Sequence, residues 1–474
     1  MTIDVNKRSG EERESSAPLP SEMLDTSARV TTTCLIGAYA AINAIPDSYL
    51  LVDAPDCAHL KAQFIHGNHD LMSTLISISG YHRIGNTALH CWKVIDKRDE
   101  QIVALLEKMG EFEGSGVVMM TSMPMATIVG IDYERLVRQA QARSGTDTFH
   151  VFDRAIDGDW MDGYAEVLDT LARSMPLSDE IERDPKKVAI VGYFMDRNEE
   201  DHHGNLRELR RLIEGLGLEL CTVWAGGEPW ETMKRGIQEA GTILSFPYAR
   251  KAARTLERRV GTPVLECRLP FGLNATVKWL EQLGESIARP EVAADLIARE
   301  LQAIMPRLEF VVPFHFLHRR AMFVGDPHLA AGFVEIVEEF GGTVPFMAIT
   351  SRKQNARHLR DGLSDTTLHV DPTIASLMEH TMEHQRSVDL VVSCNTTGAG
   401  PATEGHIEFG FPCYERHALY DRPFLGFSGL MAFADEMLRE LRKVDQMKLR
   451  REKDREKGPN GPDGPGGPDG PGGP

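Results

Sequence analysis

The stretch KKVAIVGYFMD (Lys186–Asp196) decides how this chain is expected to fold. Its short run of small and β-branched residues predicts a buried strand. A charged loop follows, and LRELRRLIEGLGLEL (Leu206–Leu220) has the pattern of a helix that ends at Gly215 and Gly217. A further strand is expected to end at Thr222–Trp224. Strand, helix and strand in this order indicate a parallel βαβ unit.

The same alternation recurs on both sides of this unit. Further strands are predicted in VVMMTS, GTILSF, LEFVVPF and DLVVSC, at residues 117–122, 241–246, 308–314 and 389–394. Strands that alternate with helices form parallel sheets with right-handed crossovers. We therefore expect an α/β fold of three units in series, with domains at residues 28–185, 186–305 and 306–449.

The two ends of the chain differ in composition from its centre. Residues 1–27 are polar and predict a disordered arm, without the apolar core of a signal peptide. Residues 450–474 are charged and then rich in Gly and Pro, which is typical of a flexible tail.

Composition limits the classes of function. The 474 residues carry a formal net charge of −18, which argues against non-specific binding to nucleic acid. No apolar run approaches the ~20 residues that span a bilayer. Seven cysteines are too few for a secreted disulfide scaffold. We expect a cytoplasmic protein that binds neither nucleic acid nor membranes and, without a GxxxxGK[ST] motif, does not itself hydrolyse ATP.

Two cysteines stand out in TTCLIGAYAAINAIPDSYLLVDAPDCAHLKAQFIHG (Thr32–Gly67). Cys34 and Cys57 each open a helix-like run beside a short β-like run, which can bring both thiolates to one edge of a parallel sheet. Two thiolates placed in this way suit a soft metal such as the iron of an iron–sulfur cluster. Both are equally compatible with ordinary buried cysteines, and spacing alone favours that interpretation.

The segment HIEFGFPCYERHALYDRPFLGFSGLMAFADEM (His406–Met437) resembles the C-terminal signature of the nitrogenase component 1 superfamily. The stretch with Cys34 and Cys57 is similar to the first two cluster-ligand positions of that family, and VVMMTSMPMATIVGID (Val117–Asp132) to its third block. The family includes nitrogenase molybdenum–iron protein subunits, protochlorophyllide reductase, the reductase of F430 synthesis and methylthio-alkane reductase. The resemblance implies three Rossmann-like domains.

The resemblance also implies a function. It is that of a catalytic-component subunit of a nitrogenase-like reductase, an oxidoreductase that receives electrons from an ATP-dependent iron–sulfur reductase protein. The cofactor would be a [4Fe–4S] or larger iron–sulfur cluster, bound by Cys34 and Cys57 and shared with a second subunit. That subunit would be a second copy or a paralogue, giving a homodimer or an α2β2 assembly. The alternatives are a metallocluster-assembly scaffold and a β-type partner of a cofactor-bearing subunit.

The chain departs from the family pattern at two positions. The third cluster cysteine would fall at Met123 or Pro124, neither of which is a cluster ligand; Cys91 is a candidate replacement, although a buried cysteine is the commoner interpretation. Ser245 falls near the cofactor-ligating cysteine of nitrogenase α-type subunits. Since serine is a poor ligand for iron–sulfur, Ser245 argues against a nitrogenase-type cofactor held by this chain alone.

His417 is the candidate catalytic residue. It follows the GFP motif, and strand carboxyl ends are where parallel sheets place ligands. An imidazole there can ligate a metal, donate a proton or bind a carboxylate, whereas a structural hydrogen bond is the plain alternative. Asp421 and Arg422 are expected to orient His417 or its substrate. DHHGN (Asp201–Asn205) is expected to be a polar loop.

Overall fold

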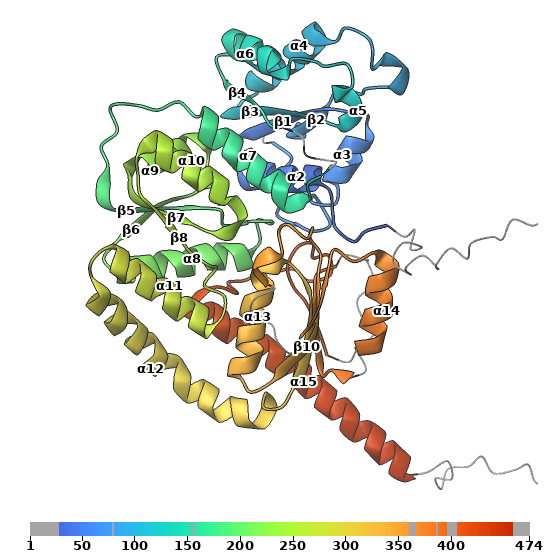
Figure 1. Ribbon diagram of the computed structural model, residues 1–474, viewed down its shortest axis with the longest axis vertical. Coiled ribbons are helices and arrows are strands. Elements are labelled where there is room, and N and C mark those ends of the chain that lie inside the picture. Colours follow the sequence, from blue (N-terminus) through green and yellow to red (C-terminus); the bar gives the residue numbers. More distant parts are fainter. Residues whose placement is uncertain are drawn as a thin grey trace, which may run out of the picture.

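The computed structural model describes residues 28–77, 80–152, 154, 157–359, 366–384, 387–395 and 405–457. The strands of these residues form three separate sheets, in which every pairing is parallel. Figure 1 shows three units of sheet and helix, at the top, at the left and at the lower right. The expected α/β class with three parallel-sheet units is confirmed.

The first sheet has the strand order β2-β1-β3-β4. Its strands are β1 (Ser48–Asp53), β2 (Ile84–Asn86), β3 (Val117–Ser122) and β4 (Asp147–His150). Along this part of the chain lie α2 (Cys34–Ala44), α3 (Cys57–Ala62), η1 (Cys91–Lys93), α4 (Asp99–Gly110), α5 (Pro124–Thr127), α6 (Tyr133–Ser144) and α7 (Trp160–Ser174). The strand order reverses between β1 and β3, so ligands are expected beyond the carboxyl ends of these two strands.

The second sheet has the order β6-β5-β7-β8. Its strands are β5 (Asp184–Val191), β6 (Glu219–Val223), β7 (Ala240–Ser245) and β8 (Val264–Glu266), and its helices are α8 (Glu200–Gly215), α9 (Trp230–Glu239), α10 (Arg250–Val260) and α11 (Leu273–Ser286). The expectation of a loop at DHHGN was wrong, since this segment lies in the first turns of α8. Glu200 and Asp201 favour a helix start there, because acidic side chains stabilise the positive end of the helix dipole.

The third sheet has the order β11-β10-β9-β12-β13. Its strands are β9 (Arg320–Gly325), β10 (Thr343–Ile349), β11 (Thr367–Val370), β12 (Leu390–Ser393) and β13 (His406–Glu408), with α13 (Pro327–Glu339), η3 (Arg357–Leu359) and α14 (Ile374–His384). The strand expected in LEFVVPF is instead the end of α12 (Pro290–His315). Leu308 is buried, whereas Phe310 and Phe314 are exposed, so the segment has a one-sided helical pattern rather than that of a buried strand.

Both ends of the described chain contact units that are distant from them in sequence. Ile374 donates a backbone hydrogen bond to Ala28 at 2.8 Å, which attaches the first described residues to the third unit. Helix α15 (Gly426–Lys457), red in Figure 1, packs against α8, α11 and α12. It continues through residues 450–457 of the expected tail; the expected arm (1–27) and the rest of the tail (458–474) lie outside the described residues. No described helix has the length and apolar character needed to cross a membrane.

Helices α2 and α7 cross so closely that both need glycine at the crossing. A Cβ atom on Gly37 would lie 1.7 Å from the carbonyl oxygen of Trp160, and one on Gly163 would lie 1.9 Å from that of Cys34. No side chain fits at such distances. This backbone contact fixes the start of α2, and with it Cys34, against the start of α7.

Candidate functional site

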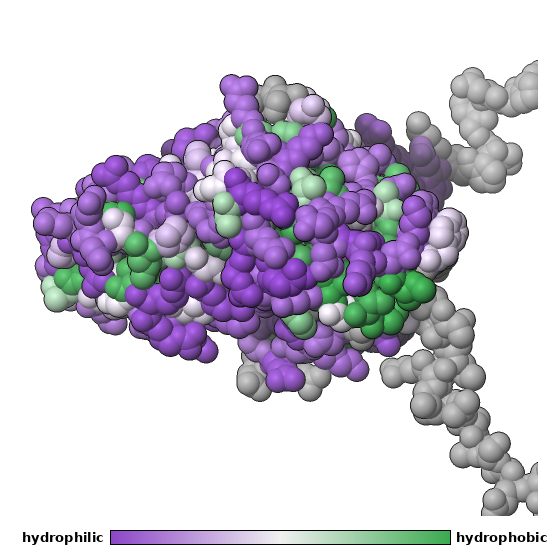
Figure 2. Space-filling model, turned by 90° about the horizontal axis from the view of Figure 1, so that it is seen from above, coloured by the Kyte–Doolittle hydropathy of each residue, from purple (hydrophilic) through white to green (hydrophobic). Residues whose placement is uncertain are grey.

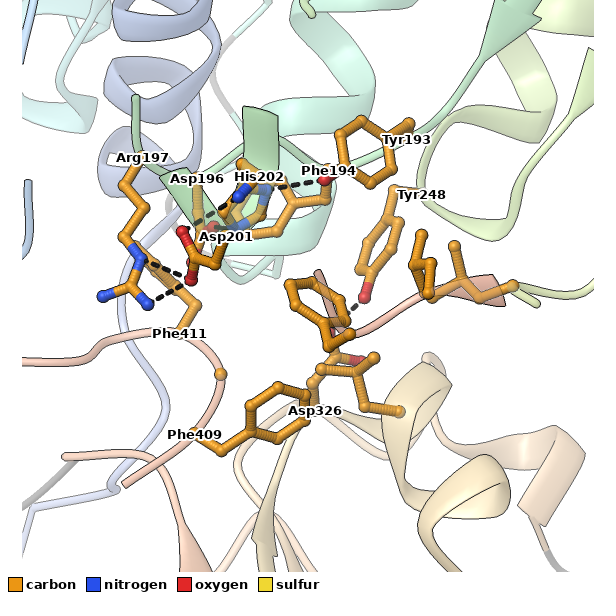
Figure 3. A pocket seen from close by; sticks show the side chains of 15 residues that line it. Tyr193, Phe194, Asp196, Arg197, Asp201, His202, Tyr248, Asp326, Phe409 and Phe411 are labelled. Carbon is orange, nitrogen blue, oxygen red and sulfur yellow. Dashed lines mark hydrogen bonds and ion pairs between the residues drawn. The ribbon is translucent and has the colours of Figure 1, made fainter. Parts of the chain in front are cut away.

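A central junction joins the three units. The segments that follow β5, β7, β9 and β13 meet there, and the loop after α3 adds His69 from the first unit. Figure 3 shows the side chains that converge on it, including Asp196, His202, Tyr248 and Asp326. The strand order of the second and third sheets reverses beside β5 and β9, so these residues occupy the edge where parallel sheets place ligands.

Asp196 is the charged centre of the junction. Its carboxylate lies 2.5 Å from Nε2 of His202 and 3.1 Å from Nε2 of His69, and all three side chains are buried. Burial alone would raise the pKa of Asp196, but His202 and His69 outweigh it and hold this pKa well below its usual value. Burial likewise opposes protonation of His202, and Asp196 and Asp201 overcome it and raise the pKa of His202. The junction therefore holds an internally compensated ion pair.

Asp326 forms a second acidic group of the junction. It caps α13 by accepting a hydrogen bond from the backbone nitrogen of His328 at 2.6 Å, and it accepts another from the hydroxyl of Tyr248. Burial raises the pKa of Asp326 to about 7, since the hydrogen bonds from Tyr248 and His328 only partly offset it.

Aromatic side chains fill most of the space between these acids. The ring of Phe194 contacts the rings of Tyr248 and Phe411. Phe409 meets Phe424 edge to face, and both of these rings line the same cavity. The cavity that remains has a volume of only about 30 Å³, enough for a water molecule or two. A cofactor or substrate of many atoms does not fit in this junction as it is packed here.

His417 lies beside the junction rather than in its cavity. Its Nδ1 is 2.7 Å from Oε1 of Glu199, a buried carboxylate that also accepts hydrogen bonds from the backbone nitrogens of Ala418 and Leu71. The ring keeps 19% of its surface exposed and lines a neighbouring cavity of about 70 Å³. The buried ion pair of Arg197 with Asp201 separates the two cavities, because both residues line each of them.

Glu199 is the orienting partner of His417. Asp421, which we expected in that role, pairs with Arg207 at 3.0 Å, and Arg422 lies 3.7 Å from Glu436. No local pattern in the sequence points to Glu199, because it is 218 residues away from His417 along the chain.

Cys34 and Cys57 lie at the starts of α2 and α3, as expected from their positions after turns. Cys34 is buried, and Cys57 is exposed. The two helices touch: the hydroxyl of Tyr39 in α2 donates a hydrogen bond to the carbonyl of Ala58 in α3 at 2.8 Å. The two cysteines thus begin two helices of the first unit that are in contact with each other.

Met123 is one of the two positions, with Pro124, at which the family's third cluster cysteine was expected. It follows β3, and its backbone nitrogen donates a hydrogen bond to the carbonyl of Asp53 at the end of β1, at 3.1 Å. The same sheet edge therefore carries Cys57 and a thioether in place of a third thiolate. Cys91 begins η1, and its side chain lies outside the described part of the structure. Ser245 ends β7 with its side chain fully buried.

The described residues contain no group of three or more His, Cys, Asp or Glu side chains arranged to hold a metal ion. The chemistry of Cys34 and Cys57 nonetheless fits part of an iron–sulfur site, because thiolates are its usual ligands. Cys221 and Cys267 are less suited, because burial raises the pKa of each to about 12 and keeps them as neutral thiols.

Comparison with known families decides the wider identity. The model of the family described as "Nitrogenase component 1 type Oxidoreductase" matches residues 33–442. The chain belongs to this nitrogenase component 1 family. Its structure also resembles that of nitrogenase Cp1 at pH 6.5, with a TM-score of 0.71 and 16% identity over 90% of this chain and 94% of the other, which shows a shared fold.

Relatives within the nitrogenase component 1 family have different roles. The nitrogenase molybdenum–iron protein beta chain of Clostridium pasteurianum is 25% identical over 49% of this chain and 56% of its own length. A light-independent protochlorophyllide reductase subunit from Chloroflexus aggregans is 27% identical over 49% of this chain and 45% of its own. The cofactor biosynthesis protein NifE of Methanosarcina barkeri is 22% identical over 85% and 86%. The matches to the first two span only about half of those relatives.

Proposed function

We propose that this protein is a subunit of a nitrogenase-like reductase. It receives electrons from an ATP-dependent iron–sulfur reductase protein, passes them through an iron–sulfur cluster at Cys34 and Cys57, and delivers them to a bound substrate in the cytoplasm. The observation that supports the proposal is that Cys34 and Cys57 begin two adjoining helices, α2 and α3, in a chain that matches the family from residue 33 to 442.

The cluster is proposed to be shared between two subunits. A [4Fe–4S] cluster takes about four ligands, and the first unit offers the thiolates of Cys34 and Cys57 beside the thioether of Met123. A second chain that brings its own pair completes the set, as an isologous interface duplicates whatever ligands it contains. The cluster would supply one-electron transfer; the chain's own part is to hold two of its irons.

The surface around Cys57 supports a partner at this place. Large apolar side chains are exposed on and after α3, in and just after η1, and just after α5: Leu60, Phe64, Leu71, Met72, Trp92, Ile95, Ile128 and Val129. Figure 2 shows apolar side chains gathered on the right of the upper face. Apolar surface of this extent is typical of a protein interface.

His417 is proposed to serve the substrate as a proton donor or polar anchor. Glu199 fixes Nδ1, which leaves Nε2 as the nitrogen able to reach a ligand in the adjoining cavity. Arg197, Arg416 and Arg422 line the same cavity, where Asp201 and Glu436 pair with them, so the cavity is polar but its charges are largely balanced. Reduction by electrons alone leaves negative charge on the substrate, so a positioned proton source is needed nearby.

The filled central junction favours the β-type alternative. A residual volume of about 30 Å³ leaves no room there for a large metallocofactor, and Ser245 offers no thiolate. In that case this chain supplies its half of the interfacial cluster, while a paralogous subunit holds the catalytic cofactor. The nitrogenase beta chain and the protochlorophyllide reductase subunit among the relatives are in keeping with this role.

Substrate-dependent electron consumption tests the proposal against the scaffold alternative. The protein, with any subunit that copurifies, is supplied with a reduced iron protein and ATP, and candidate substrates are added in turn. We expect a substrate that raises electron consumption above the background rate. A protein that carries a cluster yet transfers it to an acceptor protein, with no substrate-dependent consumption, would be a scaffold.

A further inference from the structure

A cavity lies between the first and third units, at the face of α2 and α3 that meets the segment after β13. Its volume of about 440 Å³ is in the range of small-molecule sites. The side chains that form its walls are mainly apolar: Ile36, Phe64, Ile65, Phe411 and Pro412. It is therefore shaped for an apolar body, unlike the nearly filled central junction.

One wall of this cavity is suited to an anion. Lys61 lines it, and no carboxylate among the described residues pairs with its ammonium group. The hydroxyl of Thr32 is buried without a hydrogen-bond partner in the described structure. Thr33 begins α2 without capping it by its side chain, so the positive end of the helix dipole also faces this wall. Lys61, the Thr32 hydroxyl and the start of α2 could therefore all bind a negatively charged acceptor, and none is present among the described residues of this wall.

The lining of this cavity also includes an unused acceptor. Asn395 follows β12, and its backbone nitrogen donates a hydrogen bond to the carbonyl of Pro412 at 2.7 Å, which fixes the residue in place. A hydrogen bond from its side chain helps to hold the pKa of Glu408 below its usual value against the effect of burial. Only the amide nitrogen can donate to a carboxylate, so the oxygen remains, buried and without a partner among the described residues.

We propose that this cavity binds an apolar molecule that carries a carboxylate at one end and a hydroxyl or amine donor at the other. The carboxylate pairs with Lys61 and Thr32, and the donor group with the side-chain oxygen of Asn395. This inference goes beyond the proposed function: His417 does not line this cavity, so the ligand is a second molecule, bound beside the cysteines rather than in the cavity of His417. The wall of the cavity includes Thr33, next to Cys34, and Lys61, four residues after Cys57.

Calorimetric titration of the full chain with 6-hydroxy-2-naphthoate tests the proposal. Two further probes each lack one group: 2-naphthol lacks the carboxylate, and 2-naphthoate lacks the hydroxyl. We expect saturable one-to-one binding of 6-hydroxy-2-naphthoate, weakened about tenfold or more in Lys61→Met, because the charge-assisted hydrogen bond to the carboxylate is lost. Lys61→Met should leave the binding of 2-naphthol unchanged, and Lys61→Arg should restore most of the affinity for the carboxylate.

The hydroxyl end has its own comparison. Asn395→Ala should weaken the binding of 6-hydroxy-2-naphthoate but not that of 2-naphthoate, since only the first probe has a hydroxyl that donates to Asn395. The matched control is Lys108→Met, which removes an exposed lysine of α4 and should change nothing. The proposal is overturned by absence of saturable binding at millimolar probe, or by equal affinity in wild type and Lys61→Met. Iron is measured on the same preparations. Protein that retains iron but does not bind the probe refutes the proposed cavity ligand alone. Protein that binds the probe but holds no iron refutes the proposed cluster alone.

Discussion

The central junction differs from the region of Cys34 and Cys57, here called the cysteine edge, in how its polar groups are paired. At the junction, Asp196 is buried between two histidines, and its charge is compensated within the chain. At the edge, Cys57 is exposed among apolar side chains, and the described ligand set stops at two thiols. Polar groups that are fully paired within the chain, like those around Asp196, contribute to its stability. A partial ligand set beside an apolar surface, like Cys34 and Cys57, is completed by another molecule. We therefore assign the junction to stability and the edge to function.

The largest expected effect is at the edge. Cys34→Ala or Cys57→Ala should lose most of the iron and sulfide of anaerobically purified protein, because no other thiolate replaces either ligand. The control is Cys221→Ala, whose thiol donates to the carbonyls of Val188 and Gly236 and should leave iron unchanged. Elemental analysis and the visible spectrum measure the result. Full iron in both edge variants would end the assignment.

The junction should respond in stability. Asp196→Ala leaves His69 and His202 buried without their counter-charge, and we expect a loss of about 3–5 kcal/mol of unfolding free energy. Denaturant titration measures it. The surface pair of Arg207 with Asp421 is the control: Asp421→Ala should cost at most about 1 kcal/mol, since such exposed pairs contribute little. Equal losses in the two variants would remove the distinction between the junction and an ordinary surface pair.

His417 lies beside the junction, and its substitution should lower activity without changing the assembly of the cluster. His417→Ala should keep the cluster and its reduction by the iron protein, while turnover falls about a hundredfold, as for loss of a positioned proton donor. Glu199→Gln, which keeps the size of the orienting side chain, should lower turnover less and alter its pH profile. The readouts are iron content and turnover on one preparation. Wild-type turnover in His417→Ala would make this residue structural.

The last expected effect is a change in the pH dependence of stability. The native pKa of Asp326, about 7, lies above the usual value near 4, so the native state retains a proton that the unfolded chain has released. Stability from this group is therefore greatest below pH 4 and declines as the pH rises toward 7. Asp326→Asn removes the titration, and the difference in unfolding free energy between wild type and variant should change across this range. A constant difference from pH 4 to 8 would contradict the raised pKa.

The sequence predicted what repeats locally and missed what is assembled over long distances. The β-branched runs at β3, β5 and β12 identified the sheets, and the cysteines were found because each begins a helix after a turn. The prediction of a strand in LEFVVPF was wrong because a short apolar run fits either a strand or the end of a long helix. Asp196 and Asp326 could not be singled out, because their burial and partners depend on how three units dock. The same is true of Glu199, whose link to His417 exists only in the folded chain.

Native mass spectrometry of the anaerobically purified protein tests the central claim, a cluster shared across an interface at Cys34 and Cys57. The account predicts that iron and sulfide are found only on species that contain two component 1 chains, and that Cys57→Ala yields iron-free protein. A single chain that carries four irons and four sulfides in a stable complex would contradict it.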